Sequence, residues 1–301
     1  MRLIEISGEG RYLSVERGFL TVKRSGEQFA KIPLDQILGI IGASHGITLS
    51  QNLLTRLADL GIPYVVCNAA FSPVSLVWPL QGHHLQSRAI RNQLAASRPL
   101  QKRLWQAIVR EKIRHQAIAL ECIGESSQPL QRLVKKVRSG DPGNCEAQAA
   151  RLYWTKLFGR NFTRNRDGDS PNDLLNYGYT IIRSAMARAV AGCGLHPSVS
   201  LNHSNQFNPF VLVDDLVEPF RPFVDLRVHG LIEQQKMLDK DSKSALVETL
   251  HLPCSGPENS TTLLNQIQTL ARSLSASFEQ GQAILQFPQA TDLEWRAYAG
   301  I

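Results

Sequence analysis

The chain has 301 residues and carries 33 Lys and Arg against 26 Asp and Glu, which gives a net charge of +7. Its 43% hydrophobic content is enough for packed cores and excludes a wholly disordered chain. Five widely spaced cysteines without a CxxC pair indicate neither a disulfide framework nor a zinc finger. No signal peptide or membrane-spanning run is expected, so we predict a cytoplasmic protein with a polyanionic partner such as nucleic acid.

The first 84 residues are expected to form a small β-rich domain. Residues 11–24, RYLSVERGFLTVKR, place two apolar runs around Arg17-Gly18 and predict a hairpin. A helix is predicted in SQNLLTRLADLG, which has apolar residues at helical spacing, Ser50 as its cap and Gly61 at its end. Further strands are predicted in FAKIPL, ILGIIGA, IPYVVCN and SPVSLVWPL.

From Leu85 onward the pattern becomes helical, so we predict an α+β protein whose larger, mostly α-helical second domain spans residues 85–301. Helical periodicity covers residues 85–123, with an interruption at Pro99. Segment 239–262 fits no expected element, and its HLPCSGPENS portion is predicted to be a surface loop. Other helical stretches are PLQRLVKKVR, CEAQAARLYWTKLFG, DLLNYGYTIIRSAMARAVAGCG and TTLLNQIQTLARSLSASFEQG.

Positive charge is concentrated at the start of this second domain. Between Arg88 and Arg138 there are twelve Lys and Arg residues and three acidic ones, a net charge of +9. One interpretation is a set of ordinary solvated helix faces, and the other is a phosphate-binding surface. The candidate DNA-binding residues are Arg88, Arg91, Lys102, Arg103, Lys135, Lys136 and Arg138.

Residues 213–225, VDDLVEPFRPFVD, place four carboxylates beside an apolar helical stripe. Two prolines in this stretch make an ideal helix unfavourable. Charge that is half-buried beside a core is costly unless it is paired or binds a cation, and Arg221 alone cannot neutralise four acids. The four carboxylates are those of Asp214, Asp215, Glu218 and Asp225.

Two more polar residues occur where packing alone does not require them. Glu146 lies near the start of an expected helix, after Asn144 as its N-cap, on the face that carries Ala149 and Tyr153. His203 lies in a loop between two expected helices, ahead of the acidic stretch. Each residue alone is explained by helix-dipole or structural roles. Two carboxylates and one imidazole together suit Mg²⁺ or Mn²⁺, and a hard divalent ion beside a basic surface indicates phosphodiester chemistry.

In their order and combination, several segments resemble the integrase family of CRISPR adaptation, the metal-dependent nucleases that insert new spacers. The NQFNPF and EPFRPFVD segments are most similar to members that accompany a single-protein RNA-guided effector nuclease, the type II systems. The segments that carry the resemblance are RYLSVERGFLTV, IPLDQILGIIG, GIPYVVCN, HHLQSRAIRNQL, EAQAARLYW, LLNYGYTIIRSAMARAVAGCGLHPSVSLNHSNQFNPF and DDLVEPFRPFVD.

The resemblance implies a catalytic metal site. The family's Glu, His and downstream acid fall on Glu146, His203 and Glu218, and Asp215 corresponds to a supporting acid. Relatives often have a glycine shortly before the His, where this chain has SLNH. The implied reaction inserts short duplex DNA at a CRISPR repeat by attack of a 3′-hydroxyl on a phosphodiester, with Mg²⁺ or Mn²⁺.

The resemblance also implies partners. These are double-stranded DNA (prespacer and CRISPR repeat), a second copy that makes a homodimer mainly through residues 1–84, and a small ferredoxin-like adaptation protein that completes a heterohexamer. The RNA-guided effector nuclease is a further candidate. The alternative function is a non-catalytic double-stranded-DNA-binding scaffold, which would not need Glu146, His203 and Glu218 together. The basic excess argues against a metallophosphoesterase for small nucleotides.

Overall fold

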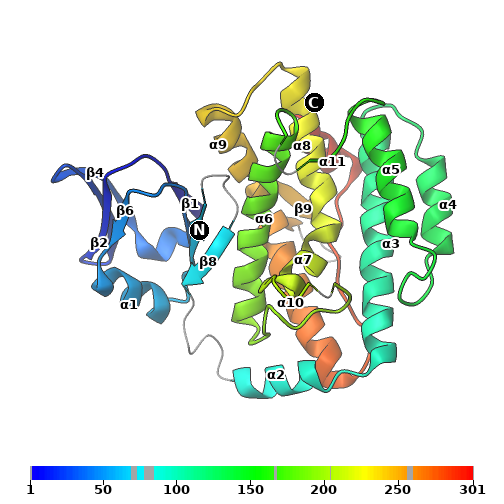
Figure 1. The fold of residues 1–301 in the computed structure, drawn as a ribbon, viewed down its shortest axis with the longest axis horizontal. Coiled ribbons are helices and arrows are strands. Elements are labelled where there is room, and N and C mark those ends of the chain that lie inside the picture. Colours follow the sequence, from blue (N-terminus) through cyan, green and yellow to red (C-terminus); the bar gives the residue numbers. More distant parts are fainter. Residues whose placement is uncertain are drawn as a thin grey trace. The chain divides into compact units, whose positions relative to one another are not determined.

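The structure is a computed structural model that describes residues 2–68, 73–77, 85–165, 168–203, 205–255 and 260–300. The chain forms two compact units, Met1–His84 and Leu85–Ile301. The first unit is rich in β-strands and the second is mostly helical (Figure 1). The α+β class predicted from the sequence is therefore confirmed.

One sheet of the N-terminal unit is built on the predicted hairpin. Strands β2 (Arg11–Glu16) and β3 (Phe19–Arg24) pair antiparallel. Arg17 and Gly18 between them have φ angles of 48° and 81°, and two positive φ values are what a two-residue hairpin turn requires. Strands β4 (Glu27–Pro33) and β6 (Ile47–Leu49) complete the order β4-β3-β2-β6, in which β6 runs parallel to β2.

The second sheet of this unit has the order β1-β5-β7-β8, with strands at Arg2–Ile6, Ile37–Gly42, Tyr64–Cys67 and Pro73–Val77. Helix α1 (Gln51–Asp59) packs its Leu53 and Leu57 into a core shared with both sheets. The Ser50 hydroxyl accepts a hydrogen bond from the Leu53 amide at 3.2 Å, which confirms the predicted cap. The short 3₁₀ turn η1 (Leu34–Gln36) precedes β5.

The predicted helical stretches are all present in the helical unit, with shifted boundaries, and a last helix at residues 292–299 was not predicted. The interruption expected at Pro99 occurs instead between Ala95 and Ser97, whose hydroxyl accepts from the Leu100 amide at 3.4 Å. Pro99 lies in the first turn of the next helix. Backbone N–H groups in a first turn have no acceptor within the helix, so the absence of an N–H at proline costs no hydrogen bond there. The first five helices are α2 (Gln86–Leu94), α3 (Arg98–Cys122), α4 (Gln128–Lys136), α5 (Cys145–Leu157) and α6 (Asn172–Gly192). The remaining helices are α7 (Val211–Val217), α8 (Arg221–Glu233), α9 (Lys240–Glu248), α10 (Leu263–Gln280) and α11 (Asp292–Ala299).

Segment 239–262 is more ordered than the sequence indicated. It forms α9, the 3₁₀ turn η3 (Thr249–His251) and a two-stranded antiparallel sheet of β9 (Pro253–Ser255) and β10 (Ser260–Thr262). The prediction of a surface loop is wrong at Cys254, which is fully buried. Residues 256–259 of the predicted loop lie outside the described residues.

Helix α6 is the packing centre of this unit. It contacts α7, α8, α9 and α10, and most of its side chains are buried. Gly178 permits the close approach of α8, because a Cβ atom there would lie 2.4 Å from Cγ1 of Val224. Among the described residues, no helix is both long and apolar enough to cross a bilayer.

Replacing Gly178 with Ala should therefore destabilise the helical unit. Overpacking of this kind typically costs about 1–3 kcal/mol, which a urea or thermal unfolding curve resolves. Gly192→Ala, in the last turn of the same helix, is the matched control because a Cβ atom there meets nothing within 4 Å. Equal unfolding curves for the two variants would contradict the packing account.

Candidate metal site and basic surface

The acidic stretch 213–225 forms one nearly continuous helical rod. Helix α7 ends at Val217, the 3₁₀ turn η2 (Glu218–Phe220) follows, and α8 begins at Arg221. Proline residues at 219 and 222 lack the N–H groups of a regular helix, which accounts for the tightened turn. The apolar members of the stretch are buried as the pattern predicts, namely Val213, Leu216, Val217, Phe220, Phe223 and Val224.

Glu218 is buried between two cations. Its Oε1 lies 2.9 Å from Nε of Arg221, and its Oε2 lies 2.5 Å from Nζ of Lys112 on α3. Burial alone would raise its pKa, but the charges of Arg221 and Lys112 lower the pKa of Glu218 to about 2. The side chain is therefore ionised at any physiological pH. The short contact of its Oε2 with the Lys112 ammonium is a charge-assisted pairing, to which both hydrogen bonding and charge contribute.

Glu146 reaches the same lysine from α5. Its Oε1 lies 2.7 Å from Nζ of Lys112. The start of α5 is capped by Asp141, which accepts from the amides of Cys145 and Glu146 at 2.9 and 3.0 Å. Asn144 occupies the predicted N-cap position, but its backbone is left-handed and its side chain accepts no capping hydrogen bond.

Lys112 is the residue of this cluster that the sequence analysis did not single out. Its side chain is only 12% exposed, and its Nζ joins Glu146 and Glu218. Burial would lower the pKa of Lys112, but the two carboxylates raise it, so the ammonium stays charged. Its neighbours at three and four positions along α3 are buried, but two of them are polar, so apolar periodicity in the sequence does not mark this face; the four are Ile108, Val109, His115 and Gln116.

His203 is held beside Asp215. The imidazole Nδ1 is hydrogen-bonded to the Asp215 carboxylate, and Trp105 packs edge-on against the ring with centroids 5.3 Å apart. Asp215 is fully buried and also accepts from the amides of Leu201 and Asn202 at 2.7 and 3.2 Å. One carboxylate thus fixes both the loop and the ring, and leaves Nε2 directed away from Asp215.

Electrostatics link His203 to the glutamates. The hydrogen bond to Asp215 raises the pKa of His203, and the charges of Glu218 and Glu146 raise it further. Even so, no group of three His, Cys, Asp or Glu side chains lies close enough to hold a metal ion in the part of the chain that the structure describes. The structure brings Glu146 and Glu218 together on Lys112, and pairs His203 with Asp215.

The other two acids of the stretch have partners of their own. Asp214 accepts from Nε of Arg183 at 2.6 Å and from the Asn208 amide at 2.6 Å, which ties the loop before α7 to α6. Asp225 accepts from the Tyr179 hydroxyl, and its burial raises its pKa to about 7. Each of the four carboxylates in the stretch therefore has its own hydrogen-bond or ion-pair partners.

The raised pKa of Asp225 predicts a pH dependence of stability. Its folded pKa lies above its unfolded value of about 4, so the folded protein retains a proton that the unfolded chain releases. The free energy of unfolding should fall as pH rises from about 4 to about 7, by at most about 1.4 kcal/mol per pH unit. Asp225→Asn should remove this contribution, so the variant should gain stability relative to the wild type between pH 5 and 8. Parallel pH profiles for the two proteins would contradict this assignment.

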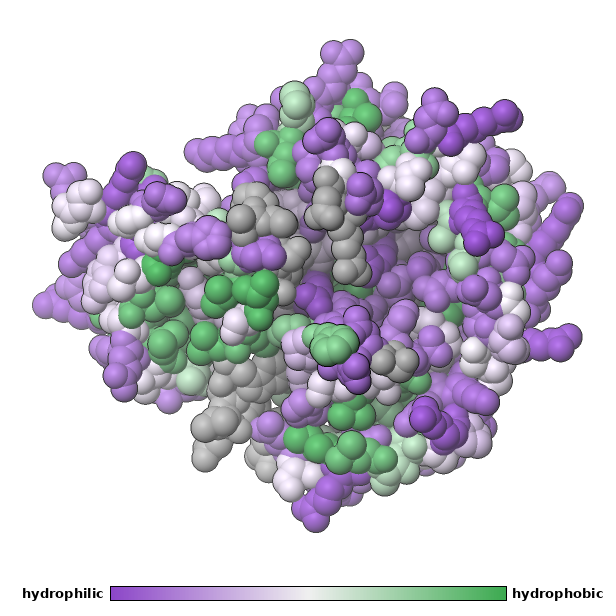
Figure 2. All heavy atoms as spheres, viewed as in Figure 1, coloured by the Kyte–Doolittle hydropathy of each residue, from purple (hydrophilic) through white to green (hydrophobic). Residues whose placement is uncertain are grey.

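The basic stretch lies on the surface, with one exception. Eleven of its twelve Lys and Arg residues are exposed, and the exception is Lys112. All seven candidate DNA-binding residues are among the exposed ones, and Arg88 forms an ion pair with Glu279 at 2.6 Å. Hydrophilic side chains cover much of the helical unit on the face shown in Figure 2. The charges are available to a polyanion without unfolding.

Neutralising part of this surface should flatten the salt dependence of DNA binding. In the variant Lys135→Gln/Lys136→Gln/Arg138→Gln, each lost phosphate contact should reduce the slope of log K against log salt by roughly 0.9. The loss should be the same for duplexes of any sequence. Arg272→Gln, which removes an exposed charge from α10, is the control. An unchanged slope in the triple variant would show that these side chains are only solvated.

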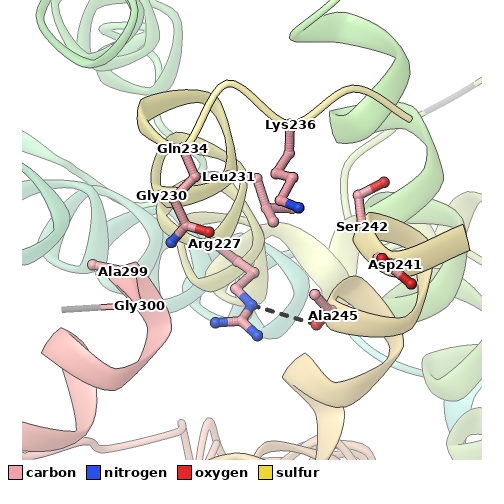
Figure 3. A pocket seen from close by; sticks show the side chains of 10 residues that line it. All are labelled: Arg227, Gly230, Leu231, Gln234, Lys236, Asp241, Ser242, Ala245, Ala299 and Gly300. Carbon is pink, nitrogen blue, oxygen red and sulfur yellow. Dashed lines mark hydrogen bonds between the residues drawn. The ribbon is translucent and has the colours of Figure 1, made fainter. Parts of the chain in front are cut away.

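A pocket of about 210 Å³ lies apart from these residues, between α8, α9 and the end of α11 (Figure 3). Arg227 and Lys236 line it together with Asp241, and Nε of Arg227 donates to the Ala245 carbonyl at 3.4 Å. The pocket includes none of the carboxylates of the candidate site. It is therefore separate from that site.

Comparison with known proteins places the chain in a family. A family model described as CRISPR associated protein Cas1 matches residues 4–252. The chain is 37% identical over 295 residues to the CRISPR-associated endonuclease Cas1 of Neisseria meningitidis serogroup C (strain 8013). The aligned region covers 96% of each of the two chains.

Two solved structures share the fold. A casposase bound to integration product has a TM-score of 0.82 at 20% identity, over 95% of this chain and 93% of that chain. A Cas6-RT-Cas1–Cas2 complex has a TM-score of 0.77 at 19% identity, over 96% of this chain and 36% of that chain. At such identities the likeness is one of fold alone. The family match and the Neisseria relative confirm the resemblance inferred from the sequence, and the chain belongs to the Cas1 family of CRISPR-associated endonucleases.

Proposed function

We propose that Glu146, His203 and Glu218 hold a divalent ion in this CRISPR-adaptation endonuclease and integrase. The observation that carries the proposal is the convergence of two carboxylates from different helices on one positive charge, at 2.7 and 2.5 Å from Nζ of Lys112. Oε2 of Glu218 is buried and already faces a cation, the Lys112 ammonium, so its surroundings are suited to a positively charged ligand. Carboxylate oxygens and an imidazole nitrogen fit Mg²⁺ or Mn²⁺.

Asp215 supports this assignment of His203. Histidines that bind metals usually donate their other ring N–H to a carboxylate or carbonyl group, which fixes the tautomer and the ring orientation. The Nδ1 contact with Asp215 is of this kind, and it leaves Nε2 for the ion. In this proposal Asp215 is a positioning residue, not a ligand.

The reaction we propose is the joining of a short duplex to a CRISPR repeat. The 3′-hydroxyl of the duplex attacks a phosphodiester of the repeat, so one phosphodiester is exchanged for another and no ATP is consumed. A bound ion would polarise the scissile phosphate as a Lewis acid. The chain itself orients the ligands, because Arg221 pairs with Glu218 and also stacks over the Tyr179 ring at 4.4 Å.

Partners follow from the same proposal. The substrates are double-stranded DNA, held at the exposed charges of α2, α3 and α4. The N-terminal unit makes a homodimer. Two such dimers assemble with a dimer of the ferredoxin-like adaptation partner into a heterohexamer. A solved complex that contains this fold, a Cas6-RT-Cas1–Cas2 complex, supports the pairing with such a partner. The RNA-guided effector nuclease is the further partner in a type II system. Membership in a family of endonucleases argues against the non-catalytic scaffold.

Glu146→Gln should fold and bind DNA but fail to join it. The amide keeps the size of the side chain and removes its charge, so the ion loses a ligand while the surface charges remain. We expect joining of a labelled duplex into a repeat-bearing plasmid, with Mg²⁺ or Mn²⁺, to fall by at least about 100-fold, because loss of a supporting group alone commonly costs 10–100-fold. Glu218→Gln should lose joining equally, but should also lower the melting temperature, because it leaves two cations without their carboxylate.

Glu125→Gln is the matched control, since Glu125 is an exposed acid paired with Lys156 at 2.9 Å. Its joining should equal that of the wild type. Near-normal joining by Glu146→Gln would show that the site is elsewhere. Joining that is lost in both Glu146→Gln and Glu125→Gln would indicate a general effect of charge removal.

A further inference from the structure

We infer that Lys112 is a built-in counter-cation, which holds Glu146 and Glu218 together before a divalent ion binds and is displaced when the ion arrives. The inference rests on the proposed metal site and assigns a role to a residue outside the proposed ligand set. Lys112 is then a positioning residue. Its ammonium competes with the divalent ion for the two carboxylates and so sets the affinity of the site for the ion.

The position of Lys112 is built into the fold. It is the exception among the exposed charges of the basic stretch, and its helical neighbours are packed in the core. Helix α3 contacts both α5 and η2, the elements that carry Glu146 and Glu218. The aliphatic stem therefore runs through packed surroundings and delivers Nζ to the space between the two carboxylates.

The local charge requires such a cation. Two carboxylates that share one partially buried site repel each other unless a positive charge lies between them. Glu218 has a second cation in Arg221, whereas Lys112 is the one cation paired with Glu146 among the described residues. Without Lys112 and without an ion, the site would carry uncompensated negative charge.

The same geometry makes Lys112 a competitor of the ion. Its Nζ contacts Oε1 of Glu146 and Oε2 of Glu218, so an ion bound by both oxygens needs the space that Nζ fills. An ammonium and a divalent ion also repel each other at such short range. Binding of the ion must therefore move Nζ away from the carboxylates. The free energy gained from the ion–carboxylate contacts is then partly offset by the loss of the Lys112–Glu146 and Lys112–Glu218 ion pairs.

Reductive methylation of the intact wild-type protein, read by mass spectrometry, tests the displacement directly. In chelator, Nζ of Lys112 is held between two carboxylates and should react slowly. With saturating Mg²⁺ its methylation should rise severalfold, while that of Lys156, paired with Glu125, should stay the same. Equal reactivity of Lys112 with and without Mg²⁺ would overturn the inference.

The variant Lys112→Met tests the competition. In chelator its melting temperature should fall, because two carboxylates lose their shared cation. Its dissociation constant for Mn²⁺, measured by electron paramagnetic resonance or calorimetry, should fall by about tenfold or more, because removing a unit charge at this range acts through a strong Coulomb interaction. The gain in melting temperature on adding Mn²⁺ should exceed that of the wild type. Lys156→Met should alter neither the affinity nor this gain.

The outcomes separate the two proposals. Mn²⁺ affinity that is unchanged or weaker in Lys112→Met would make Lys112 an ordinary structural ion pair and overturn the inference. If the wild type binds no Mn²⁺, or if Glu146→Gln binds it as well as the wild type, the proposed metal site itself fails. The methylation experiment uses the wild-type protein. It therefore tests the displacement of Lys112 even if the Lys112→Met variant does not fold.

Discussion

One ammonium group connects the chain segments that form the candidate site. Lys112 from α3 meets Glu146 from α5 and Glu218 from the turn between α7 and α8, and the packing of α3 against these elements places all three side chains. An ion pair buried to this degree contributes little net stability, because desolvation offsets most of its attraction. Its effect is geometric: α3 must keep its position for the two carboxylates to face each other.

The buried polar groups continue beyond this point into the core. Arg221 pairs with Glu218 and stacks over Tyr179, and the hydroxyl of Tyr179 donates to Asp225. The rod of residues 213–225 thus carries charge along one side while its apolar side fills the core. This arrangement explains how a basic protein tolerates four neighbouring carboxylates: each one meets its own donor or cation, and none depends on bulk solvent alone.

The sequence predicted those features that follow from local rules or from motif order. Apolar periodicity identified the helices, the hairpin around Arg17-Gly18 and the buried stripe beside the acids, and the order of motifs indicated the family. Local rules failed where tertiary structure selects among equivalent groups. Asp141, not Asn144, accepts the capping hydrogen bonds of α5, and segment 253–255 forms a strand with β10 in contact with α10 and α11, where Cys254 is buried. Lys112 was counted as one charge of many, because only the fold shows which of twelve basic residues points inward.

The separations along the chain have a consequence for when the candidate site is assembled during folding. Asp215 and His203 are 12 residues apart, so their pairing closes a short loop at small entropic cost. Lys112 and Glu146 are 34 residues apart, and Lys112 and Glu218 belong to segments still farther apart in sequence. The histidine and its acid can thus meet early in folding, whereas the two glutamates face each other only when α3, α5 and η2 have packed. A nascent or partly unfolded chain would therefore lack the arrangement of the two glutamates around Lys112 until the helical unit has packed.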